Sequence, residues 1–160
     1  MKQHKRWLYL LLTGWMLLGI SACAQKESVT PSEPDHIILD DYEIRYKGFT
    51  MMSDINENPA LVISLDFTNN GKEATSYLWA ISEKAFLDGI GLDVATVFSD
   101  TDSYDTVTKA QLTEIVPGKT IEVKSAYVLP DREDETVEVE FSQNLGKKKG
   151  KLSIDLTEAW

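Results

Sequence analysis

Few side chains in this sequence have the reactivity that catalysis or metal binding requires. The chain contains one cysteine, Cys23, and two histidines, of which only His36 lies beyond the first 22 residues. Without a second histidine or a free thiol, the usual ligand sets of zinc cannot form. The nucleophile elbow, the phosphate-binding loop and the HExxH motif are missing from the sequence. We therefore expect a protein that is not an enzyme and holds no cofactor. A catalytic pair of carboxylates on different strands is the exception, because such a pair cannot be recognised in a sequence.

An acidic stretch offers several hard oxygen ligands close together. Residues 99–106 (SDTDSYDT) include Asp100, Asp102 and Asp105, and Ca²⁺ is bound by about six to eight oxygen atoms. The spacing differs from that of an EF-hand loop, and the central glycine of such a loop is missing. A weak calcium site and a solvated surface turn are therefore the two alternatives, and solvated turns are the more frequent.

Four lysines form the one basic cluster of an otherwise acidic chain: Lys147, Lys148, Lys149 and Lys151. We expect them at a hairpin tip, where they can contact anionic lipid headgroups or envelope polymers. A lysine close to a charged membrane surface contributes about 1 kcal/mol. The alternative is a solvated turn whose charges prevent pairing between sheet edges, and this alternative is the one we favour.

The first 23 residues have the features of an export signal. Lys2, Lys5 and Arg6 precede fourteen uncharged residues, Trp7 to Ile20, a length typical of the apolar part of a signal peptide. A helix that spans a bilayer needs about 20 apolar residues. The run is followed by Ile20-Ser21-Ala22-Cys23, which resembles the bacterial lipobox.

This resemblance implies that a diacylglycerol group is attached to the Cys23 sulfur and that the chain is then cut after Ala22. Two acyl chains anchor a protein stably, whereas a single chain is marginal. We therefore expect a protein anchored by lipid to the extracytoplasmic face of the cell membrane. The alternative is an ordinary secretory signal, in which Cys23 is incidental.

The remainder of the sequence is predicted to be a tether followed by one domain. Residues 1–22 are the expected signal peptide, residues 23–36 the lipidated cysteine with a polar, proline-containing linker, and residues 37–160 the domain. Removal of the signal leaves 13 of the 16 basic residues against all 26 acidic ones, a formal net charge of −13. Such a chain is not expected to bind nucleic acid, because phosphate recognition needs clustered Lys and Arg.

From residue 42 onward, apolar and polar residues alternate with the period of two that is typical of strands with one buried face. The turn signals Asn69-Asn70-Gly71 and Pro117-Gly118 separate such segments, and the first of them is expected to close a hairpin. Trp79 is expected in a central strand and in the core. The expected strands lie near residues 42–47, 61–68, 77–81, 94–98, 121–129, 137–141 and 152–156.

Seven or eight short strands without a convincing helix after residue 23 predict an all-β protein, an antiparallel β-sandwich. A barrel is the competing architecture, since its strands alternate in the same way.

Several turn and core residues resemble those of a family of uncharacterised Gram-positive lipoproteins with an immunoglobulin-like domain of unknown function. The likeness covers most of residues 42–143 and lies in Asn69–Gly71, the Trp79 segment, Ala85–Gly89, Val116–Gly118 and Tyr127–Leu129. It implies export, lipidation and an immunoglobulin-like sandwich, and it supplies no catalytic residue.

These observations favour a membrane-anchored module that binds a protein or an envelope polymer through its loops. A solute-capturing lipoprotein of a transporter is an alternative, although the 138 residues from Cys23 onward are few for the usual two-lobed capture fold. A lipoprotein that interferes with incoming phage or toxins is a further alternative.

Overall fold

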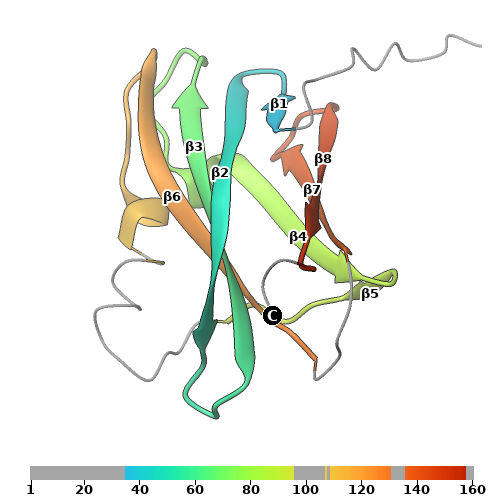
Figure 1. Ribbon diagram of the computed structural model, residues 1–160. Coiled ribbons are helices and arrows are strands. Elements are labelled where there is room, and N and C mark those ends of the chain that lie inside the picture. Colours follow the sequence, from blue (N-terminus) through green and yellow to red (C-terminus); the bar gives the residue numbers. More distant parts are fainter. Residues whose placement is uncertain (1–34, 96–106, 108, 131–135, 158–160) are drawn as a thin grey trace, which may run out of the picture.

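Two antiparallel four-stranded sheets pack face to face in the computed structural model (Figure 1), which describes residues 35–95, 107, 109–130 and 136–157. The first sheet contains, in spatial order, β1 (His36–Ile38), β2 (Tyr42–Ser53), β3 (Pro59–Asn69) and β6 (Lys119–Val128). The second contains β5 (Ile90–Gly91), β4 (Ile81–Leu87), β7 (Thr136–Gln143) and β8 (Lys149–Asp155). A single helical turn, α1 (Tyr77–Ala80), connects β3 to β4.

The alternating residues of these strands build the core between the sheets. One face of β3 is fully buried, and the facing strands of the other sheet contribute residues that are equally inaccessible. Burying one such large apolar side chain contributes about 1.5 to 3 kcal/mol. The fully buried core residues include Leu61, Ile63, Leu65, Phe67, Val123, Val137, Val139 and Phe141.

This arrangement confirms the prediction of an all-β antiparallel sandwich, and the barrel alternative is wrong, because the described strands form two separate sheets. An immunoglobulin-like arrangement is compatible with the two sheets. None of the helices in the described part of the chain has the length and apolar character needed to cross a bilayer.

The opposite face of the first sheet is also partly covered. Ala60, Val62 and Ala126 form a second apolar cluster with Ala95 and Val107. The Ala95 N–H donates to the Ala126 carbonyl oxygen at 2.9 Å, which holds the connecting segment against the edge of β6. This coverage explains why β3 contains consecutive buried residues in addition to alternating ones.

Two sequence-based expectations between β3 and β4 are wrong. Asn69-Asn70-Gly71 does not close a hairpin, since β3 and β4 lie in different sheets. Residues 77–80 form α1 instead of a strand, and Trp79 is 77% exposed instead of buried. In one helical turn, positions three apart share a face, so the burial of Tyr77 and Ala80 turns Trp79 outward.

The hairpin turns agree better with the sequence. The β2–β3 turn is held by the Asp54 carboxylate, which accepts hydrogen bonds at 2.8 Å from the N–H groups of Asn56 and Asn58. The Asn58 side-chain amide also donates to this carboxylate, and these bonds lower the pKa of Asp54. Asp88 and Gly89, both at positive φ, form the two-residue turn between β4 and β5.

The two sheets approach each other closely where β1 meets β8. A Cβ atom added to Gly150 would lie 2.2 Å from Cγ2 of Ile37, which is itself buried. Only a residue without a side chain therefore fits at position 150.

We predict that Gly150→Ala lowers the free energy of unfolding by about 1 to 3 kcal/mol, because the added methyl group overpacks this contact. Chemical denaturation measures the change. Gly91→Ala is the matched control, since its Cβ would meet Phe86 at an ordinary 3.9 Å. Equal stability of the two variants would show that β1 does not pack on β8 in this way.

Candidate functional site

Four segments come together at one end of the sandwich, which we call the tether end (Figure 1). They are the β1–β2 loop (residues 39–41), the loop from β3 to α1 (residues 70–76), α1 itself and the β7–β8 turn (residues 144–148). The described chain also begins nearby, at Asp35, because β1 has three residues and spans only about 10 Å. The tether predicted from the sequence therefore joins the domain at this end.

The β1–β2 loop and the β7–β8 turn are joined by hydrogen bonds. The N–H groups of Lys147 and Lys148 donate to Oδ2 of Asp40 at 3.1 and 3.4 Å, and these bonds lower the pKa of Asp40. The Gln143 side chain bonds Asp41 twice, accepting from its N–H at 2.9 Å and donating to its carboxylate at 2.8 Å. The turn is thereby fixed relative to the first sheet.

The four lysines predicted as a basic cluster do not all lie in the turn. Lys147 and Lys148 lie in it, whereas Lys149 begins β8 and Lys151 lies further along that strand. Lys151 forms cross-strand ion pairs with Glu140 at 2.9 Å and Glu138 at 3.6 Å. The contact with Glu140 raises the pKa of Lys151 and lowers that of Glu140. Three lysines therefore remain for an external contact.

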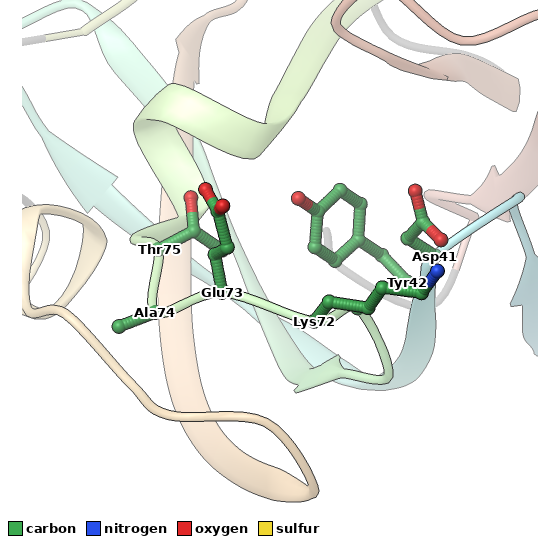
Figure 2. Close-up of a pocket in the computed structure, with 7 residues that line it drawn as sticks. Asp41, Tyr42, Lys72, Glu73, Ala74 and Thr75 are labelled. Carbon is green, nitrogen blue, oxygen red and sulfur yellow. The ribbon is translucent and has the colours of Figure 1, made fainter.

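A hollow of about 400 Å³ lies between the β1–β2 loop and the loop before α1. Figure 2 shows Glu73 and Thr75 on one side of it and Tyr42 and Asp41 on the other, with Lys72 between them. Apolar and aromatic side chains dominate most ligand pockets, whereas charged and hydroxyl groups predominate here. The hollow therefore suits a small polar solute better than an apolar ligand.

The wall of this hollow is held in place by Asn69, a fully buried residue at the end of β3. Its side-chain amide donates to the carbonyl oxygens of Glu73 at 2.8 Å and Ile115 at 3.0 Å, and its Oδ1 accepts from the Gly71 N–H at 2.9 Å. Asn69 thus connects the loop before α1 to the segment that precedes β6.

A carboxylate, Glu83, lies inside the sandwich. Glu83 is half-buried as a residue, but its Oε1 is buried and has no hydrogen-bond partner among the described residues. Oε2 accepts from the hydroxyl of Tyr77 and from that of Ser125, the latter at 2.7 Å. The nearby Tyr127 hydroxyl also favours the charged form of this carboxyl group and so acts to lower its pKa.

Burial raises the pKa of Glu83, because desolvation disfavours the charged form, and the three hydroxyl groups offset this effect only in part. The pKa values of Tyr77 and Tyr127 are raised in turn, first by desolvation and then by the Glu83 charge. A buried glutamate surrounded by hydroxyl groups is therefore protonated more readily than an exposed one.

The remaining predicted site residues lie outside the described part of the chain. These are Ala22 and Cys23 of the processing site and Asp100, Asp102 and Asp105 of the acidic stretch, so lipidation and calcium binding stay predictions. Among the residues that the structure describes, no group of His, Cys, Asp or Glu side chains is arranged to hold a metal ion.

Sequence reasoning missed two residues that matter here. Glu83 occupies an inward position, in phase with Ile81, Ala85 and Leu87, so the period of β4 would have revealed it. No such signal marks Asn69, because the carbonyl oxygens that it binds belong to residues 4 and 46 positions away.

Comparison with known proteins identifies a family and a fold. The model of a family described as a domain of unknown function (DUF5067) matches residues 20–143. No curated protein matches the chain.

Solved structures of similar shape come from three bacteria. A candidate lipoprotein of Staphylococcus aureus has a TM-score of 0.60 at 16% identity, covering 79% of this chain and 91% of that one. The candidate lipoprotein ycdA of Bacillus subtilis has a TM-score of 0.60 at 14% identity, covering 78% and 39%. An uncharacterised β-sandwich protein of Clostridium difficile has a TM-score of 0.53 at 18% identity, covering 78% and 92%. At such identities these likenesses show a shared fold.

We predict that Glu83→Gln changes how stability depends on pH. Because the pKa of Glu83 is raised in the folded state, its contribution to stability is full below the ordinary glutamate range and is lost as pH rises through the raised value. Glutamine carries no charge, so the variant does not lose this contribution at alkaline pH. Its free energy of unfolding relative to that of the wild type should therefore rise by on the order of 1 kcal/mol from acidic to alkaline pH.

Urea denaturation across this pH range measures the difference between the two proteins. Glu122→Gln, at an exposed position of β6, is the matched control and should follow the wild-type profile. A Glu83→Gln profile parallel to that of the wild type would contradict the raised pKa.

Proposed function

Since the family model spans residues 20–143, the chain belongs to the DUF5067 family, and we propose that it is a lipid-anchored β-sandwich module that binds a partner outside the cytoplasm. The observation that carries this proposal is the extent of the match. It begins at Ile20, so it includes Cys23 and continues to the end of β7. The predicted processing site and the sandwich as far as β7 therefore lie within one family match.

The similar structures support the anchor. Two of them are described as candidate lipoproteins, from Staphylococcus aureus and Bacillus subtilis. In this chain, the Ile20–Cys23 lipobox pattern follows an uncharged run of signal-peptide length. We propose that Cys23 carries the lipid and that the sandwich lies on the extracytoplasmic face of the membrane.

Binding, and not catalysis, is the proposed activity. In the Glu83 carboxyl group, Oε1 is inaccessible to solvent and Oε2 accepts from the hydroxyl groups of Tyr77 and Ser125, so this group is poorly placed to act on a substrate. The tether end instead presents loops that are fixed by hydrogen bonds to Asn69 and Asp40. Loops held rigidly by a sandwich are a common form of binding surface, and a protein or an envelope polymer is the proposed partner.

We predict that Cys23→Ala removes the protein from the membrane fraction, or leaves a precursor that is not cut after Ala22. The reason is that the thiol is the acceptor of the diacylglycerol group. Membrane fractionation and intact-mass measurement report the result. Ser21→Ala keeps a small residue before the cysteine and should leave the anchored form unchanged. A Cys23→Ala protein of mature length that still sediments with membranes would refute the proposed anchor.

Crosslinking of the anchored protein in cells, followed by mass spectrometry, tests the binding role. A crosslinked protein or polymer that is lost when the tether-end loops are changed supports it. A specific rise in the unfolding temperature with a small polar solute would instead favour solute capture in the hollow.

A further inference from the structure

Three large apolar side chains at the tether end are exposed to solvent and are not part of the core. Trp79 is 77% exposed, Leu78 is 52% exposed and Leu145 is fully exposed. The Asn144 side chain donates to the Trp79 carbonyl oxygen at 2.7 Å, and the Asn144 N–H donates to that of Ala80 at 2.9 Å. These bonds hold the β7–β8 turn against α1. We call Leu78, Trp79 and Leu145 the apolar tip.

Leu145 also has a backbone conformation that does not suit leucine. Its φ is +65°, and the Gly146 N–H donates to the Gln143 carbonyl oxygen at 3.1 Å, so Leu145 is the third residue of a four-residue turn. That position normally holds glycine or asparagine, because a side chain with Cβ is strained there. A strained residue whose side chain packs on nothing within the described domain suggests a contact outside the domain.

Positive charges lie beside the apolar tip. Lys147 and Lys148 follow Leu145 in the turn, Lys149 begins β8, and all three are exposed. No ion pair among the described residues includes any of them. Asp40 interacts with Lys147 and Lys148, and Asp41 lies beside the turn through its bonds with Gln143, so the three lysines outnumber the two neighbouring carboxylates. Aromatic and aliphatic residues flanked by lysines are typical of contacts with the headgroup region of a bilayer.

The point of attachment places this surface close to lipid. Eleven residues separate Cys23 from Asp35, and a chain of that length spans at most about 40 Å when fully extended. Asp35 lies at the tether end, as does the apolar tip. A lipid on Cys23 therefore keeps the tip at a high local concentration near the bilayer, where even a weak contact is populated.

We propose that the apolar tip, together with Lys147 and Lys148, inserts into the headgroup region of an anionic bilayer as a second membrane contact of the anchored protein. This inference rests on the proposed lipid anchor. Trp79 lies at the level of the headgroups, Leu145 reaches the acyl boundary, and the lysines meet the lipid phosphates. The contact orients the domain, so that the β2–β3 turn at the opposite end (residues 54–58) faces away from the membrane.

The test uses the full lipidated chain reconstituted in phosphatidylcholine vesicles with and without phosphatidylglycerol. Trp160→Phe makes Trp79 the one tryptophan of the mature chain. We expect Trp79 emission to shift to the blue and to be quenched by brominated acyl chains, more strongly in the anionic vesicles.

Substitutions in the apolar tip distinguish an effect on the membrane contact from an effect on the stability of the fold. Leu145→Gly should abolish most of the quenching, yet raise the unfolding temperature by a few degrees because it relieves the strained φ. Lys147→Gln with Lys148→Gln should reduce the quenching in anionic vesicles only. The matched controls are Ile90→Ser, at an exposed apolar position on the far end of β4–β5, and Lys84→Gln with Lys109→Gln. Both should leave the quenching unchanged.

The outcomes distinguish the two proposals. A protein that floats with the vesicles while Trp79 stays in water and is not quenched overturns the second contact and leaves the anchor intact. A protein that does not float with the vesicles overturns the anchor itself. A blue shift in the absence of lipid that increases with protein concentration overturns the membrane contact in favour of self-association.

Discussion

The organisation of the tether end depends on one buried amide. Asn69 ends β3 where the chain leaves the first sheet, and its fully buried side chain is hydrogen-bonded to three backbone groups of the surrounding loops. A buried polar group that loses its partner costs about 1 to 3 kcal/mol. This requirement fixes the loop before α1 and the chain before β6 together, and with them the place where β4 begins in the second sheet.

The polar groups around Glu83 connect the two sheets through the core. The carboxyl group and the hydroxyl groups of Tyr77, Ser125 and Tyr127 come from α1, β4 and β6, so they join both sheets through the core. Apolar residues of similar volume would give at least equal stability, because desolvation of a carboxylate is costly. The arrangement instead fixes how α1 and β6 are placed relative to β4, which an apolar contact specifies less strictly.

The sequence predicted the strands whose alternation is long, and failed where the pattern is short. In β3, β6, β7 and β8 several successive residues alternate, and burial in the structure follows them. Between Tyr77 and Ile81 only three positions alternate, which a helical turn fits equally well, so Trp79 was placed in the core although it is exposed. The turn at Asn69–Gly71 was recognisable, but local chemistry does not tell which sheet the next strand joins. The hollow and the partners of Glu83 were not predictable, because they come from distant parts of the chain; Ser125, for example, lies 42 positions from Glu83.

The position of the first described residues decides which end of the sandwich the tether joins. Among the described residues, β1 pairs with residues 43–45 of β2, and the Asp35 carbonyl oxygen accepts from the Tyr46 N–H at 2.8 Å. Directly beyond this point β2 has a register shift between Tyr46 and Gly48, with Gly48 at φ +135°, and such a bulge increases the local twist of a strand. The described chain thus begins beside α1 and the β7–β8 turn, so the proposed lipid anchor and the apolar tip lie at the same end of the sandwich.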